Sequence, residues 1–276
     1  MKLIEQISNF VNNPMPLWEN DLNSLLVLEK SQQPNLVETD YSIENCVLGQ
    51  GKTHVILFDI PGSKIKIETP TDVLNNFYES HGLEPLNTTQ IYELQADKKV
   101  SDALNILALV PSIANFLSCI VKTVQIIRPD NEETDISYSH PEVPFSIFVS
   151  VCETTSLRST LRVAESILHE AMHLKLTLVE NILPLVNPFT GNVFFSPWRD
   201  EKRPARGVLH GLFVFKAILD YFTLVKNLVE LKAERTYIES RIGQIKTDLL
   251  HLKDFASCID LTKDGAILTK NLLPLS

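Results

Sequence analysis

A His-Glu-x-x-His (HExxH) motif within a long helical pattern constrains this chain more than any other feature. His169 and His173 stand four residues apart, and Glu170 directly follows the first histidine. In an α-helix this spacing places both imidazoles on one face, where they can bind a single divalent metal. Apolar residues recur at threes and fours from Thr155 to Ile182, which predicts a helix over this range. We therefore predict a metalloprotein; the alternative is that both histidines are ordinary residues of a half-buried helix face.

The pattern of elements predicts an α+β fold, mainly helical, in which a small antiparallel sheet supports the HExxH helix in a zincin-like arrangement. We divide the chain into an N-terminal α+β portion over 1–100, a candidate for peptide recognition, and a metal-binding catalytic domain over 101–276. The predicted strands cover 53–60, 64–68, 121–128 and 145–152. An apolar stripe over 226–255 predicts a long C-terminal amphipathic helix that faces the core.

Composition restricts the partners and the compartment. The chain has 276 residues, 44% of them apolar, and a formal net charge of −9, which argues against a nucleic-acid surface. Glu5 interrupts the apolar start that a secretory signal requires, and the four cysteines lie far apart, so we expect a cytoplasmic protein. The uncharged segment 103–121 contains several polar residues and Pro111. We interpret it as a buried helix kinked at Pro111 and predict no membrane span.

A catalytic metal site needs a third protein ligand. After a loop over 185–203, a helix is predicted to begin near Arg203 and to place Arg203, Arg206 and His210 on one face. His210 is our candidate for the third ligand. A zinc peptidase could instead use a glutamate, and the nominal choices are Glu180, Glu201, Glu230 and Glu234.

The two arginines of this face favour a cosubstrate that carries carboxylates. A guanidinium pairs bidentately with a carboxylate, which an enzyme that holds a dicarboxylate needs and a peptidase does not. The alternative is that Arg203 and Arg206 are solvated or pair with nearby acidic residues, which are Asp200, Glu201 and Glu165.

Several motifs taken together resemble one enzyme family. The HExxH helix is followed by Ser196-Pro197-Trp198-Arg199, then Arg203-Pro204, then Gly207-Val208-Leu209-His210-Gly211. This combination resembles the HExxH-type peptide β-hydroxylases, which are Fe(II)- and 2-oxoglutarate-dependent enzymes that modify ribosomally made peptide natural products. The resemblance covers about residues 137–222 and includes Ser137-Tyr138-Ser139 ahead of the helix.

The resemblance implies an oxygenase that uses Fe(II), 2-oxoglutarate and O2 to hydroxylate the β-carbon of a residue in a precursor peptide. It implies His169, His173 and His210 as metal ligands, a set that differs from the common two-histidine, one-carboxylate triad. Glu170 would be catalytic, either orienting a ligand or water or touching the metal. For 2-oxoglutarate the implied residues are Arg206 first, then Arg203 and Arg199, and for the substrate Trp198.

Two other readings stay open. In a zinc metallopeptidase, Glu170 would activate a metal-bound water as general base. A non-catalytic peptide-binding protein would keep the metal for structure alone.

His140 could enter the site, although its predicted place is an exposed loop. Neither nucleic acid nor membrane is an expected partner, and the sequence predicts no oligomeric state.

Overall fold

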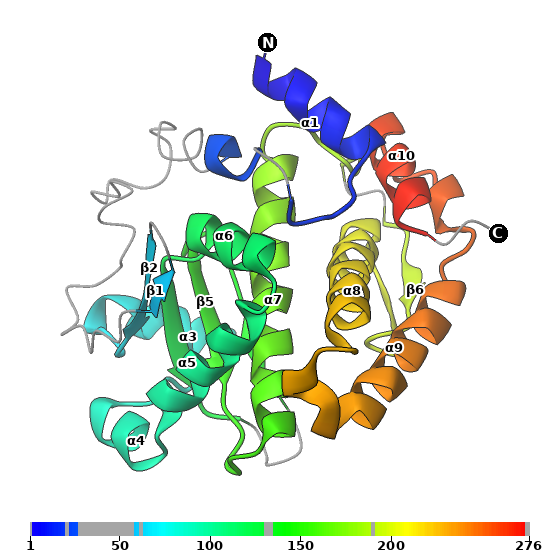
Figure 1. The fold of residues 1–276 in the computed structure, drawn as a ribbon. Coiled ribbons are helices and arrows are strands. Elements are labelled where there is room, and N and C mark those ends of the chain that lie inside the picture. The colour runs from blue at the N-terminus through cyan, green and yellow to red at the C-terminus, as the bar shows by residue number, and fades with distance from the viewer. Residues whose placement is uncertain are drawn as a thin grey trace. The chain divides into compact units, whose positions relative to one another are not determined.

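The computed structural model describes residues 2–19, 22–26, 58–60, 63–129, 135–188 and 191–273 (Figure 1). The chain divides into two units, of which the first contains Met1–Leu26 and Lys175–Ser276 and the second contains Val27–Leu174. The predicted division at residue 100 does not coincide with this partition, because residues on both sides of it belong to the second unit. The peptide-recognition role of residues 1–100 stays a prediction.

The HExxH motif lies in a single long helix, as predicted. Helix α7 runs from Leu157 to Glu180, close to the expected 155–182. Ser156 begins it, because the Ser156 Oγ accepts a hydrogen bond of 3.0 Å from the Ser159 backbone N–H. The motif histidines therefore lie in the interior of a helix and not at a frayed end.

The second unit is built around a five-stranded sheet in the order β1-β2-β3-β5-β4. The central strands β2, β3 and β5 are parallel, and the edge strands β1 and β4 are antiparallel to their neighbours. The prediction of an antiparallel sheet was therefore wrong, because the sheet is mixed. The strands are β1 (Phe58–Ile60), β2 (Ser63–Glu68), β3 (Thr123–Ile127), β4 (Ser137–Tyr138) and β5 (Ser146–Ser150).

Helices fill the connection from β2 to β3. Parallel neighbours need a crossover connection, which here contains α3 (Asn75–His81), α4 (Thr88–Glu93), α5 (Ala96–Leu107) and α6 (Pro111–Ile120). Helix α6 packs on β1 and β2, and α3 contributes to an apolar cluster with β3 and β5. The segment predicted as one kinked helix is two helices, because Pro111 lacks a backbone N–H and occupies the first turn of α6.

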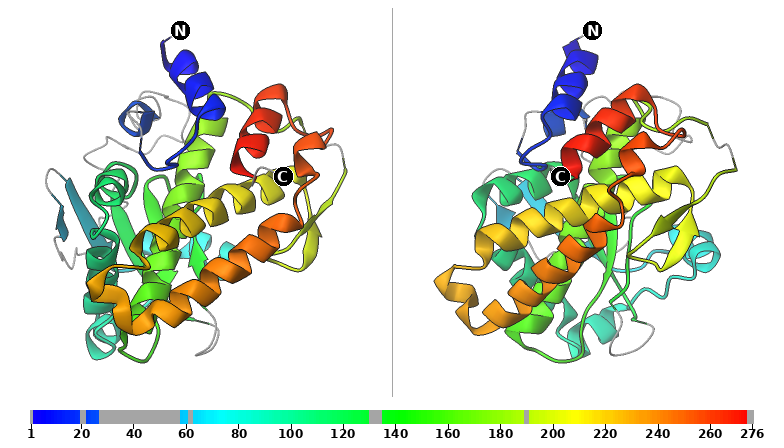
Figure 2. Two further views of the ribbon diagram at one scale, coloured as in Figure 1. Left: turned by 45° about the vertical axis from the view of Figure 1, so that its right-hand side comes forward. Right: turned by 90° about the vertical axis from the view of Figure 1, so that its right-hand side faces the viewer.

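The first unit is mainly helical. Helix α1 (Lys2–Asn12) lies against α10 (Lys263–Leu272), and α8 (Ala205–Val225) lies against α9 (Arg235–Leu250) (Figure 2). The predicted amphipathic helix over 226–255 is shorter than expected. Two 3-10 turns flank α9, and they are Val229–Glu234 and Phe255–Ser257.

The predicted loop 185–203 contains a short hairpin of β6 (Phe194–Ser196) and β7 (Glu201–Arg203). Helix α8 follows it directly. By length and composition α8 is apolar enough to cross a membrane, with a mean hydropathy of 1.6, but 67% of that stretch is buried inside the structure. Burial of this extent is what a core helix requires.

Candidate metal centre

The two motif histidines approach each other as two ligands of one ion would. The Nε2 atoms of His169 and His173 are 3.1 Å apart, and their ring centroids are separated by 4.7 Å. Two nitrogens at about 2.1 Å from a metal, with an angle of about 90–110° between them, lie roughly 3.0–3.4 Å apart. This separation, at which the two rings can also share a hydrogen bond, is compatible with both histidines binding one divalent ion.

Glu170 is held in place by two serines of the second unit. It is buried, and its Oε1 and Oε2 accept hydrogen bonds of 2.6 Å each from the Oγ atoms of Ser137 and Ser139. Side chains two apart in an extended segment point to the same face, so Ser137 of β4 and Ser139 directly after it reach one oxygen each. Glu170 Oε1 also lies 3.9 Å from His169 Nε2. The carboxylate is thus fixed beside the histidine pair, and both oxygens are already engaged.

A third contact orients β4 along α7. Asp135, two residues before Ser137, accepts a hydrogen bond of 2.7 Å from the Arg162 guanidinium. Asp135, Ser137 and Ser139 therefore all face α7, and their partners Arg162 and Glu170 lie about two turns apart on it. Sequence reasoning treated the two serines only as part of a resemblance. The available signal was the Ser-x-Ser spacing, which places two hydroxyls on one strand face.

In the first unit, His210 and Arg206 meet at one carboxylate. Both lie on α8 one turn apart, and the buried His210 has its Nε2 atom 2.9 Å from Glu180 Oε2. Arg206 donates its Nε–H to the same oxygen over 2.8 Å. The prediction that Arg206 and His210 share a helix face is confirmed, but Arg203, which was expected on the same face, lies on β7 ahead of α8. The convergence of His210 with His169 and His173 stays a prediction.

Charge and burial determine the state of this trio. Burial lowers the pKa of His210, and the opposing pull of Glu180 does not restore it. Burial alone would raise the pKa of Glu180, but its hydrogen bonds with His210 and Arg206, and their charge, outweigh burial and lower it. A neutral His210 donates Nε2–H to Glu180, which leaves the ring lone pair on Nδ1. A histidine that binds a metal commonly donates its other ring N–H to a carboxylate in this way.

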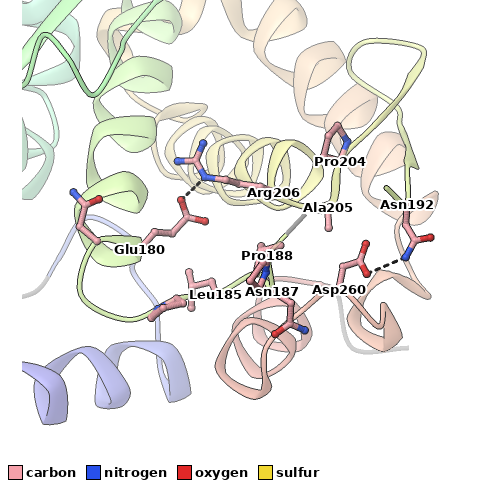
Figure 3. Close-up of a pocket in the computed structure, with 12 residues that line it drawn as sticks. Glu180, Leu185, Asn187, Pro188, Asn192, Pro204, Ala205, Arg206 and Asp260 are labelled. Carbon is pink, nitrogen blue, oxygen red and sulfur yellow. Dashed lines mark hydrogen bonds and ion pairs between the residues drawn. The ribbon is translucent and has the colours of Figure 1, made fainter. Parts of the chain in front are cut away.

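A pocket of about 490 Å³ in the first unit is lined by two of these residues, Glu180 and Arg206, and not by His210 (Figure 3). The Glu180–Arg206 pair borders one side, and Asn192 donates a hydrogen bond of 3.0 Å to Asp260 at another. Pro184, Pro188 and Pro204 supply much of the apolar wall. The volume lies within the range of about 300–1,000 Å³ that is usual for small-ligand sites.

The other predicted cosubstrate and substrate residues lie outside the lining of this pocket. Arg203 lies 3.6 Å from Glu201, and its side chain packs over Gly207. Its position therefore agrees with the alternative in which this arginine pairs with a nearby acidic residue. Trp198 stacks on Phe215 with ring centroids 4.8 Å apart. Roles for Arg203, Arg199 and Trp198 in binding stay predictions.

Trp198 also explains why α8 carries a glycine after His210. A Cβ atom built on Gly211 would lie 2.6 Å from the Trp198 ring, closer than any real contact. The indole can therefore lie directly on the backbone of α8 only because residue 211 has no side chain. This packing fixes the segment 196–199 against the helix that carries Arg206 and His210.

Comparison with known proteins does not assign the chain to a family. No protein-family model matches the chain, and no curated protein matches it with significant similarity.

Proposed function

We propose that this chain is an Fe(II)- and 2-oxoglutarate-dependent oxygenase that hydroxylates the β-carbon of a residue in a ribosomally made precursor peptide. The observation that carries the proposal is the meeting of His210 and Arg206 at one oxygen of Glu180. These are the residues that the family resemblance pairs as third ligand and cosubstrate anchor. An arginine beside a prospective ligand is what a dicarboxylate cosubstrate requires.

Imidazole is a ligand type that iron accepts. His169 and His173 have the separation of two ligands of one ion, and His210 is oriented by a carboxylate as metal-binding histidines commonly are. With 2-oxoglutarate and O2, bound iron would supply the oxidising power for the C–H bond. The tasks of the protein are then to hold the cosubstrate, to position the peptide and to limit the access of water.

Arg206 would pair with the distal carboxylate of 2-oxoglutarate. Its Nε–H is used by Glu180, but its side chain is 53% exposed and its terminal nitrogens extend at the border of the pocket (Figure 3). Glu180 has two effects here: it fixes the orientation of Arg206, and it offsets part of its charge. The guanidinium is therefore preorganised, which reduces the entropy that binding must otherwise overcome.

The zinc peptidase is the second candidate, and the contacts of Glu170 bear on it. A general base must offer a lone pair to the water it activates. Ser137 and Ser139 each donate a hydrogen bond to one oxygen of Glu170, which leaves each oxygen a second lone pair but holds the carboxylate in a fixed position. This arrangement supports a positioning role for Glu170 more than the role of a mobile proton acceptor.

We also propose a cytoplasmic location for the enzyme. Among the described residues, Cys152 and Cys258 are free thiols, as a reducing compartment would keep them. A reducing compartment would also keep iron in the Fe(II) state.

Cosubstrate binding can be tested before the peptide is known. Fe(II) and 2-oxoglutarate are added anaerobically, and formation of a chelate is followed through its visible charge-transfer absorption. We expect a saturable band in the wild type, a large loss of 2-oxoglutarate affinity in Arg206→Gln, and no band in His169→Ala. Arg235→Gln is the matched control, because this exposed arginine pairs with Glu239 on α9. An unchanged affinity in Arg206→Gln would exclude Arg206 as the anchor.

The reaction itself needs the precursor peptide, which we expect to be encoded beside the gene. With O2 present, the oxygenase should form succinate and add one oxygen atom to the peptide. Cleavage of the peptide without any need for 2-oxoglutarate would support the peptidase instead.

A further inference from the structure

Outside the HExxH motif, the second unit brings two histidines and a carboxylate together. His81 is the last residue of α3, and His140 and Glu142 lie in the loop between β4 and β5. One ligand atom from each residue lies within 4.8 Å of the others. The ring centroids of His81 and His140 are 4.7 Å apart. Nearly sixty residues separate His81 from His140 in the sequence, so the fold, and not local spacing, assembles this cluster.

Strand β4 connects this cluster to the HExxH helix through its two faces. Ser137 and Ser139 point to Glu170, and Tyr138 between them points the opposite way. The Tyr138 hydroxyl lies 2.8 Å from His81 Nδ1. A ring N–H at Nδ1 that donates to this oxygen would place the lone pair of His81 on Nε2. That is the arrangement in which an outer partner fixes the tautomer of a metal-binding histidine.

Aromatic rings hold both histidines in place. The Phe77 ring centroid is 4.4 Å from that of His81 and 5.7 Å from that of His140, and Tyr138 stacks on His140 at an angle of 12°. Both imidazoles are half-buried, whereas Glu142 is exposed. The two imidazoles are therefore held by their neighbours, and the exposed carboxylate completes the cluster on the solvent side.

One contact would have to change on metal binding. The backbone N–H of Glu142 points to His140 Nδ1 over 3.3 Å, which is long for a hydrogen bond. Coordination through Nδ1 would replace it, and coordination through Nε2 would move the ring proton to Nδ1. Either change gives up one weak interaction for a metal bond.

We propose that His81, His140 and Glu142 form a second divalent-metal site, which takes Zn²⁺ with a water in the fourth position. Two imidazoles and one carboxylate are a usual zinc ligand set, and zinc binds such sites more tightly than Fe(II). A bound ion would tie the end of α3 to the β4–β5 loop. It would thereby fix the strand whose serines hold Glu170. This site is distinct from the proposed iron centre and does not depend on it.

The test uses the full chain, stripped of metal with a chelator. The double variant His169→Ala with His173→Ala removes the HExxH ligands. Zn²⁺ is titrated calorimetrically, and the bound metal is counted by mass spectrometry after gel filtration. We expect this variant to retain one equivalent of Zn²⁺ with micromolar or tighter affinity. No retained zinc in a variant whose circular dichroism is native would overturn the proposal.

Single substitutions then locate the ion in that background. Glu142→Gln changes an exposed side chain, so it should leave the fold intact and weaken zinc binding by about tenfold or more. Tyr138→Phe keeps the ring and should weaken binding by roughly 10- to 100-fold. His251→Gln on the first unit is the control and should change nothing. Zinc affinity that is unaffected by both Glu142→Gln and Tyr138→Phe would place the ion elsewhere and refute the site.

Discussion

Replacement of Lys175 by methionine should stabilise the protein at mildly acid pH and destabilise it at alkaline pH. Lys175 is fully buried on α7, its Nζ donates to the Leu17 carbonyl, and it lies 4.7 Å from the centroid of the Phe10 ring. Burial lowers the pKa of this ammonium from 10.5 to about 7. Methionine keeps most of the volume and removes the charge.

The size of the effect follows from the pKa. At about 1.4 kcal/mol per pH unit, the drop from 10.5 to about 7 destabilises the folded state by about 5 kcal/mol below pH 7. Between pH 7 and 10.5 the unfolded chain binds the proton and the folded chain does not, so the stability of the wild type rises with pH. Loss of the hydrogen bond to the Leu17 carbonyl and of the amine's packing should cost the variant about 2–4 kcal/mol at every pH.

Lys175→Met should therefore be more stable than the wild type by about 1–3 kcal/mol near pH ~6, and less stable near pH ~9.5. Urea unfolding of the chelator-treated protein, followed by circular dichroism at both pH values, measures the difference. The exposed Lys202→Met is the control, since it has no burial to relieve. A difference between Lys175→Met and wild type that does not change with pH would show that the buried ammonium is not the cause.

Three further variants test other parts of the structure. Glu68→Gln should remove a pH dependence, because burial raises the pKa of Glu68 to about 7. In urea unfolding, the free energy of unfolding of the wild type should fall by about 3 kcal/mol as pH rises from 4.5 to about 7. The variant should not show this decrease. Gly211→Ala should lower the free energy of unfolding by about 1–3 kcal/mol, since its Cβ meets the Trp198 ring; an unchanged melting temperature would contradict this packing. Ser137→Ala with Ser139→Ala should reduce turnover at least tenfold with the metal content unchanged, and wild-type turnover would show that these hydroxyls do not position Glu170.

The long helices could be predicted from sequence because their signals are local. The apolar period of α7 and the proline ahead of α8 gave both elements within a few residues. The shared face of Arg206 and His210 followed from helix geometry alone. We interpreted Pro111 as a kink within one helix, but it lies at the start of α6. The sequence alone does not show whether the chain bends or begins a new helix at a proline, because tertiary packing decides this.

Features that depend on distant pairing could not be predicted in the same way. A strand pattern does not reveal its partner, so the parallel core of the sheet was missed. Strand β4 spans only Ser137–Tyr138, too short for a periodic signal, yet it holds Glu170. Glu180 was one of several nominal carboxylates until the structure placed it against His210 and Arg206.

Isotope labelling of the reaction tests the central claim most directly. The Fe(II)-loaded protein is given 2-oxoglutarate, the neighbouring precursor peptide and ¹⁸O2, and both products are analysed by mass spectrometry. An oxygenase should place one labelled atom in the peptide and one in succinate, and His210→Ala should abolish both. A peptide that is cleaved with oxygen from solvent, or that stays unlabelled while the iron is bound, would contradict the account.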